Sequence, residues 1–96
     1  MKENGQGNRS LAMKVEHHLQ GMAVCPVDGT LDTYSVIVRC HRLIPVEEIR
    51  DVLLAFKDRR IFQEDMTHDL ACILACEVET IGIHSGVRTR VTCSWG

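Results

Sequence analysis

The stretch CPVDGTLD, from Cys25 to Asp32, brings together residue types that could perform covalent catalysis. Cysteine is a strong nucleophile near neutral pH, because a small fraction of a free thiol is already ionised. Pro26 and the pair Asp28-Gly29 predict a turn that places Cys25 at the mouth of a loop. The carboxyl of Asp32 could then lie near the sulfur and act as its proton donor. Equally, Cys25 could pack as a small apolar residue and Asp32 could only begin a strand.

A second polar group, Gln63-Glu64-Asp65, follows Phe62 at the predicted start of a helix. Acids and glutamine are favoured in a first helical turn by capping and by the helix dipole. A carboxylate such as Glu64 could also accept two parallel hydrogen bonds from a guanine-like edge, which presents a ring N–H beside an amino group. The spacing alone leaves both interpretations open.

A third group, His68, Cys72 and Cys76, recurs at steps of four and could present an imidazole and two thiolates to zinc. No fourth ligand is evident, and these residues lie beside apolar helix positions, so we expect core packing and no metal site. The cysteine count is odd and no secretory segment is evident, so we expect reduced thiols in a cytoplasmic protein. Those expected to be structural are Cys40, Cys72, Cys76 and Cys93.

Composition limits the classes of protein that remain. The 96 residues are 45% hydrophobic but only 4% aromatic, which predicts one small domain whose weak core is helped by oligomerisation. A formal net charge of −2 argues against a general nucleic-acid-binding module. No apolar run approaches the roughly 20 residues that cross a bilayer, so we expect no membrane association.

The hydrophobic pattern predicts six elements. Residues 1–10 are polar and rich in Gly and Asn, and we expect a disordered tail before a single domain over 11–96. Alternation from Leu11 and again over 33–42 predicts two strands, the second with Tyr34, Val36, Val38 and Cys40 on one face. Pro45 begins a helix with an apolar face of Val46, Ile49, Leu53 and Phe56. A second helix begins near Gln63 and has Met66, Leu70, Ile73 and Leu74 on one face. Residues 78–84 and 87–93 flank Ser85-Gly86 as a hairpin. This strand-strand-helix-helix-strand-strand order predicts an α+β fold with an antiparallel sheet and both helices on one face.

The segment CPVDGTLD, followed by a strand, a helix and then IFQED, resembles the QueF family of the tunnelling fold. The resemblance runs from about Val24 to Val91. The family pattern has Cys-Pro, an Asp seven residues after the Cys, and later His-Glu, which correspond here to Cys25, Asp32 and Gln63-Glu64. It implies a tunnelling fold that oligomerises into a barrel, as a ring or stacked rings.

The resemblance also implies nitrile chemistry on 7-cyano-7-deazaguanine, free or within tRNA or DNA. Cys25 would attack the nitrile carbon to form a thioimide, and Asp32 would protonate the nitrile nitrogen. Glu64, beside Gln63, would bind the guanine-like edge across a subunit interface.

Two departures from the family pattern bear on the branch. Gln63 replaces the family histidine, and the last hairpin has His84-Ser85-Gly86-Val87 where the reductases carry an Arg-Gly-Gly stretch associated with NADPH. The chain therefore resembles the QueF-like branch, which needs no cofactor and adds ammonia to the thioimide to form an amidine, as in archaeosine. Two alternatives remain: an NADPH-dependent reductase that forms the 7-aminomethyl product, and a non-catalytic domain that binds a purine or pterin. His84 is expected to be an ordinary turn histidine.

Overall fold

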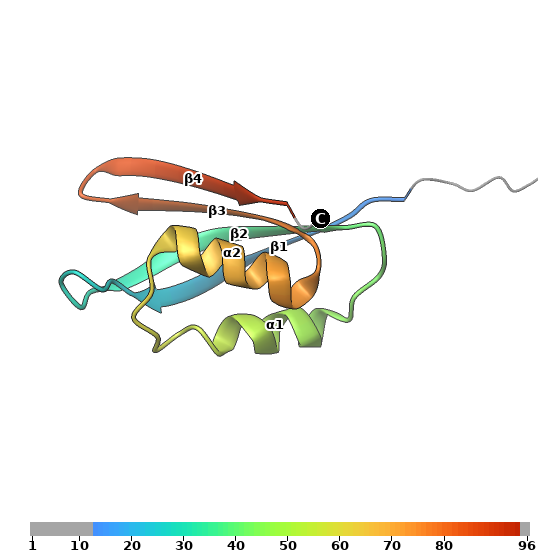
Figure 1. Ribbon diagram of the computed structural model, residues 1–96, viewed down its shortest axis with the longest axis horizontal. Helices are drawn as coiled ribbons and strands as arrows, with labels where there is room; N and C mark the ends of the chain where they lie inside the picture. The colour runs from blue at the N-terminus through green and yellow to red at the C-terminus, as the bar shows by residue number, and fades with distance from the viewer. Residues whose placement is uncertain (1–12, 95–96) are drawn as a thin grey trace, which may run out of the picture.

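The computed structural model describes residues 13–94, so the predicted tail over 1–10 lies outside the described residues. The elements are β1 (Val15–Val24), β2 (Leu31–Cys40), α1 (Val46–Leu54), α2 (Gln63–Leu74), β3 (Glu77–His84) and β4 (Val87–Cys93). The predicted order of strands and helices is confirmed (Figure 1).

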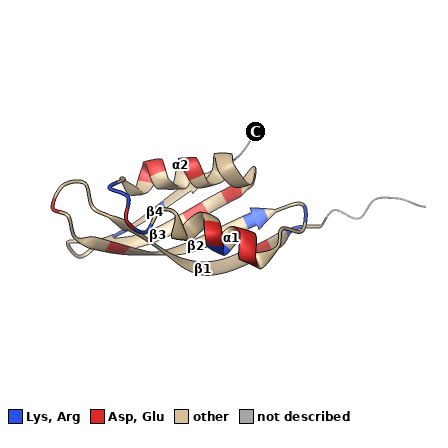
Figure 2. Ribbon diagram, turned by 90° about the horizontal axis from the view of Figure 1, so that it is seen from below, with Lys and Arg blue, Asp and Glu red and all other residues tan. Residues whose placement is uncertain are grey.

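The four strands form one antiparallel sheet in the order β1-β2-β3-β4. Both helices cover the same face of this sheet, as the two perpendicular views show (Figures 1 and 2). β1 and β4 form the two edges of the sheet. Within residues 13–94, no helix is long and apolar enough to cross a membrane.

The core lies between the sheet and the helices and follows the predicted periodicity. Every second residue of β2 points inward, while buried residues of the helices recur at intervals of three or four. The residues of this core that were predicted as such are Tyr34, Val36, Val38, Cys40, Ile49, Leu53, Phe56, Met66, Leu70 and Leu74. Val46 and Ile73 were expected on these buried faces but are 49% and 58% exposed. Ile73 lies roughly 90° around the helix from the centre of the stripe that the buried residues of α2 form.

The link between the helices is tied to the end of β1. The Val24 N–H donates to the Arg59 carbonyl at 2.8 Å, and the Ile61 N–H donates to the Val24 carbonyl at 3.1 Å. Since Cys25 follows Val24, this pairing brings the first turn of α2 beside the loop that carries Cys25. α1 itself ends at Leu54, and Phe56 is buried from the turn that follows.

The face of the sheet away from the helices carries a cluster of ion pairs. Arg39 lies 2.8 Å from carboxylate oxygens of both Glu16 and Glu77, and 2.9 Å from Glu79. The hydrogen bonds that Arg39 donates to these carboxylates, the one to Glu16 first, raise the pKa of Arg39. Alternation along the strands thus separates an apolar helix-covered face from an ion-paired one.

Two cysteine expectations are wrong. Cys40 and Cys76 form a disulfide, with their Cα atoms 5.1 Å apart, and are not reduced thiols. The cause is strand register: Arg39 pairs with Glu77, so Cys40 and Cys76 are the next facing pair. α2 ends at Leu74 and Ala75 adopts a left-handed conformation, so Cys76 is not on a helix face with His68 and Cys72. Cys72 is exposed and does not pack in the core.

Candidate active site

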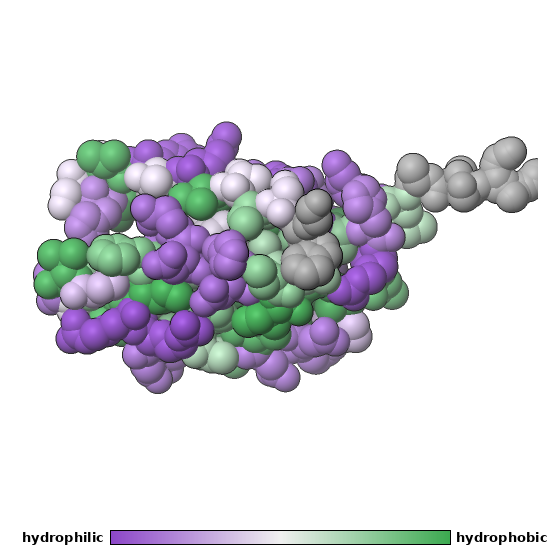
Figure 3. All heavy atoms as spheres, viewed as in Figure 1, coloured by the Kyte–Doolittle hydropathy of each residue, from purple (hydrophilic) through white to green (hydrophobic). Residues whose placement is uncertain are grey.

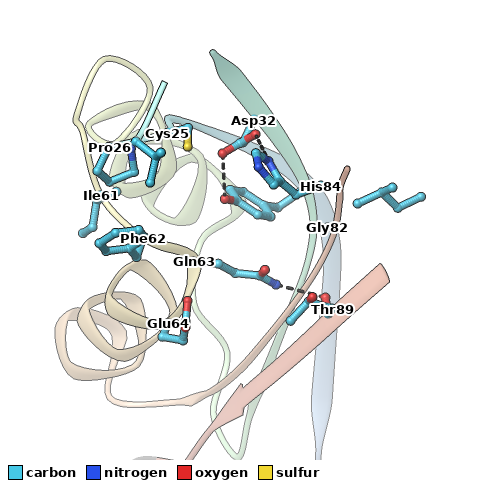
Figure 4. Close-up of a pocket in the computed structure, with 13 residues that line it drawn as sticks. Cys25, Pro26, Asp32, Ile61, Phe62, Gln63, Glu64, Gly82, His84 and Thr89 are labelled. Carbon is cyan, nitrogen blue, oxygen red and sulfur yellow. Dashed lines mark hydrogen bonds and ion pairs between the residues drawn. The ribbon is translucent and has the colours of Figure 1, made fainter. Parts of the chain in front are cut away.

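An open cavity of about 220 Å³ lies at the end of the sheet where the β1–β2 loop, the β3–β4 hairpin and the start of α2 meet. Cys25, Asp32, Gln63 and Glu64, the four predicted site residues, all line it. Cys25 and Asp32 lie on one side, with Gln63 and Glu64 facing them across the opening (Figure 4). The structure therefore gathers residues from three separate segments around one space.

Apolar side chains surround the opening. Val27, Phe62 and Ile83 line the cavity while remaining 79%, 50% and 71% exposed. On the left of Figure 3, at the end of the molecule that carries the loop and hairpin, exposed hydrophobic residues lie among hydrophilic ones. Such a rim would suit the flat face of a planar ligand.

The Cys25 loop is closed by its own backbone. The Cys25 N–H donates to the Thr30 carbonyl at 2.8 Å, and the Gly29 N–H donates to the Cys25 carbonyl at 2.9 Å. Gly29 has a φ of 77°, a left-handed conformation that glycine adopts without strain. The turn holds Cys25 at 6% exposure against the wall of the cavity.

Within this loop a carboxylate oxygen of Asp28, which was predicted only as a turn residue, lies within 4.8 Å of the Cys25 sulfur. The Oδ1 of Asp28 accepts hydrogen bonds from the Thr30 N–H at 3.0 Å and the Thr30 hydroxyl at 2.7 Å. These two bonds, followed by one from the Cys25 thiol, lower the pKa of Asp28 to about 2. Asp28 is therefore a carboxylate at neutral pH.

Asp32 is positioned by side chains on both sides. The Tyr34 hydroxyl donates to its Oδ2 at 3.4 Å, and Nδ1 of His84 lies 3.8 Å from its Oδ1 (Figure 4). The Asp32 side chain retains 18% exposure, so it is largely enclosed and still open to the cavity. Burial, followed by the charge of Asp32, raises the pKa of Tyr34 to about 12.

His84 is a site residue that the sequence reasoning missed. Tyr34 pairs with Gly82 in the antiparallel β2–β3 pair. Asp32, two residues before Tyr34, therefore comes to face His84, two residues after Gly82. The signal was present in the Ser85-Gly86 turn, whose positive φ angles of 52° and 78° fit a two-residue hairpin and fix the register. Counting back from that turn places His84 at the end of β3, whereas its position opposite Asp32 depends on the register of β2 with β3.

Gln63 ties the start of α2 to the sheet. Its Nε2 lies 3.2 Å from the Thr80 carbonyl, 3.1 Å from the Thr80 hydroxyl and 3.1 Å from the Thr89 carbonyl. Backbone carbonyls can only accept, so the amide nitrogen must face β3 and β4. The amide oxygen then points away from these acceptors, where it could accept a hydrogen bond from a ligand.

Glu64 is exposed at the rim of the cavity, next to Gln63 (Figure 4). Its negative charge contributes, as a minor cause, to the raised pKa of Tyr34. The carboxylate therefore lies within electrostatic reach of the cavity interior and is free to turn towards a ligand.

Gly82 gives the cavity its shape. A Cβ at this position would come within 2.6 Å of the Tyr34 ring, a distance that real side chains do not tolerate. The missing side chain allows the ring to lie flat against β3 and to extend its hydroxyl to Asp32.

No protein-family model matches this sequence, and no curated protein matches it. A solved structure does, that of "the archaeosine synthase QueF-Like in the apo form", with a TM-score of 0.81 over 92% of this chain and 98% of that one, at 23% sequence identity. The match spans nearly the whole of both chains, so it confirms the small α+β fold that the family resemblance implied. The chain therefore has the fold of the QueF-like archaeosine synthase.

Proposed function

We propose that this chain is an enzyme that converts the nitrile of a 7-cyano-7-deazaguanine base into an amidine. The observation that carries the proposal is the meeting of Cys25, Asp32 and Glu64 around one cavity, in a fold shared with an archaeosine synthase. These residue types supply a nucleophile, an acid and a carboxylate for a guanine-like edge, and they come from distant parts of the chain.

In the first step the Cys25 sulfur bonds to the nitrile carbon, while the nitrile nitrogen takes up a proton from Asp32. The thiol proton returns to Asp32, so the sum of thiol and nitrile is a thioimide with no other reactant. The enclosed position of Asp32 and its contacts with Tyr34 and His84 support this role, because a proton carrier must be held at a fixed place.

In the second step ammonia bonds to the thioimide carbon. The C–S bond then breaks, the sulfur recovers its proton, and the product leaves as an amidine. No oxidant or reductant is consumed. The cavity is open to solvent at its mouth, so ammonia would have access to the carbon held on Cys25.

Recognition of the base is assigned to the other side of the cavity. Glu64 would accept two hydrogen bonds from the ring N–H and amino group, and the Gln63 amide oxygen would accept a further one. Phe62 and Ile83 would cover the ring faces. A cavity of about 220 Å³ is smaller than typical drug-sized sites of roughly 300–1,000 Å³, which fits a single base.

A nucleic acid that carries the base would have to avoid the helices. α1 and α2 bear six acidic residues, Glu47, Glu48, Asp51, Glu64, Asp65 and Asp69, against one arginine, Arg50 (Figure 2). Phosphates would be repelled from that face, so we propose that tRNA or DNA approaches from the hairpin side, where Arg88 lies.

We further infer that copies of the chain join edge to edge, because within residues 13–94 the outer backbone groups of β4, and those of β1 before Val24, pair with no other element. Sedimentation at micromolar concentration should show an oligomer, and a monomer would contradict this inference.

Product analysis tests the reaction. The protein should convert 7-cyano-7-deazaguanine, free or in RNA, to the amidine when ammonium is supplied, as seen by mass spectrometry. Consumption of NADPH with formation of the 7-aminomethyl base would instead identify a reductase. Binding of the base without either product would identify a binding domain.

A further inference from the structure

A second kind of ligand fits the mouth of the cavity. The Sγ of Cys25, a carboxylate oxygen of Asp28 and a ring nitrogen of His84 all lie within 4.8 Å of one another. These donors come from the end of β1, the following turn and the end of β3. Thiolate, carboxylate and imidazole are the donor types of zinc sites, and three protein ligands with one open position characterise reactive zinc. We propose that Cys25, Asp28 and His84 form a Zn²⁺ site that reversibly blocks the nucleophile, contrary to the expectation from sequence that no metal binds.

The orientation of Asp28 suits this role. Both hydrogen bonds from Thr30 go to Oδ1, so they hold the carboxyl group in place while Oδ2 remains available as a ligand. Asp28 and His84 are exposed, on a turn and at a hairpin end. Donors around a tetrahedral zinc ion lie about 3.3–3.6 Å apart, given bond lengths of roughly 2.0–2.3 Å. Closing the site therefore requires the donors to approach one another by at most about 1.5 Å, and two of them are on the exposed surface.

Asp32 completes the arrangement from behind His84. Its Oδ1 lies 3.8 Å from Nδ1 of His84, an ion-pair distance, so a small movement would form a hydrogen bond there and leave Nε2 of the same ring for the metal. Histidines that bind zinc generally donate their other ring N–H to a carboxylate, which fixes the ring and strengthens the bond. Two nearby carboxylates also favour a cation electrostatically at this point.

The consequence for reactivity rests on the proposed function. Zinc would take the sulfur lone pair that attacks the nitrile, so the metal-bound protein would form no thioimide. Removal of the metal would restore the nucleophile.

The chain offers a matched control. On the surface of α2, Cys72 Sγ lies 3.8 Å from Nε2 of His68, which gives a cysteine and a histidine without the same set of three converging donors. Cys72→Ser and His68→Ala should therefore leave tight metal binding unchanged.

Cobalt(II) serves as a spectroscopic probe in the absence of substrate and thiol reductants. The wild-type chain should bind one Co²⁺ and show a thiolate-to-cobalt charge-transfer band. Cys25→Ser should abolish the band, while His84→Ala and Asp28→Asn should each weaken Co²⁺ affinity by at least about 10-fold. Wild-type affinity in both of these variants, or loss of the band in Cys72→Ser, would overturn the proposal. Asp28 and His84 are both exposed, so we expect these substitutions to leave the fold intact.

Protection of Cys25 by Zn²⁺ tests whether the metal blocks the nucleophile. Stoichiometric Zn²⁺ should slow alkylation of Cys25 by iodoacetamide, and a chelator should restore the rate, whereas alkylation of Cys72 should change little. Unaltered alkylation of Cys25 at saturating Zn²⁺ would overturn the site. If zinc protects Cys25 but no nitrile adduct ever forms on the free thiol, the metal site stands and the proposed function fails.

Discussion

The Tyr34 hydroxyl lies 3.4 Å from Oδ2 of Asp32 and donates a hydrogen bond to it. Tyr34 is the only tyrosine in the sequence, so its ionisation reports directly on this contact. A raised pKa means that the folded protein favours the neutral phenol. The stabilisation from Tyr34 is therefore complete below about pH 10 and is lost as the pH rises through about 12.

Absorbance titration of tyrosinate should give a midpoint near 12 in the folded protein and near 10 in denaturant. Asp32→Asn should lower the folded midpoint, because it removes the neighbouring charge and the carboxylate acceptor. The midpoint should remain above 10, since burial is the largest cause of the shift. An unchanged midpoint in Asp32→Asn would show that the two side chains do not interact in solution.

Gly82→Ala should displace the Tyr34 ring and thereby disturb its contact with Asp32. The added methyl group would meet the Tyr34 ring at 2.6 Å, so the ring must move away from β3 and from Asp32. Overpacking of this kind costs about 1–3 kcal/mol, and chemical denaturation should show a loss in that range. The tyrosinate midpoint should also shift. Gly86→Asn is the control, because no atom lies within 4 Å of the added Cβ and Asn tolerates positive φ.

The Cys40–Cys76 disulfide predicts a thiol count. Protein denatured without reductant should titrate three thiols, Cys25, Cys72 and Cys93, and after reduction it should titrate five. Because the bond closes a loop of 36 residues, its removal in a Cys40→Ser, Cys76→Ser double variant should destabilise the fold by about 2–4 kcal/mol. Five free thiols before reduction would contradict the pairing.

Glu64→Gln should weaken binding of the base. The amide keeps the size of the side chain but loses the charge and one acceptor, which is worth about 1.5–3 kcal/mol, or roughly 10- to 150-fold in Kd. Asp65→Asn is the matched control, since Asp65 follows Glu64 directly and does not line the cavity. Calorimetry in a Cys25→Ala background measures binding without reaction. Equal losses in both variants would show a general charge effect at the helix start.

The sequence predicted the fold well because each element has a clear period. The alternation along β2 and the spacing of Met66, Leu70 and Leu74 each assign one buried face, and the Ser85-Gly86 turn closes the last hairpin. Few arrangements of the strands and helices bury all of these apolar faces. Ile73 was misplaced because a spacing of three extends the stripe to its margin, where burial depends on neighbouring elements.

Contacts between distant segments were harder to predict. The roles of Asp28 and His84 depend on how a turn folds back on Cys25 and on the register of β2 with β3, and neither shows in residue spacing. The same register produces the Cys40–Cys76 pair, which an odd cysteine count argued against. Cys25, Asp32 and Glu64 were singled out because a family pattern joins them, and the structure then places them around one cavity.

Intact-protein mass spectrometry after incubation with 7-cyano-7-deazaguanine tests the central claim most directly. In the absence of ammonia the wild-type chain should gain the mass of one substrate molecule, with peptide mapping placing it on Cys25, and Cys25→Ala should gain none. Asp32→Asn should form the adduct about 10²–10⁴-fold more slowly, because it cannot deliver the proton to the nitrile nitrogen. A wild-type chain that binds the base and never gains its mass, or an Asp32→Asn variant that reacts at the wild-type rate, would contradict the proposed roles of these two residues.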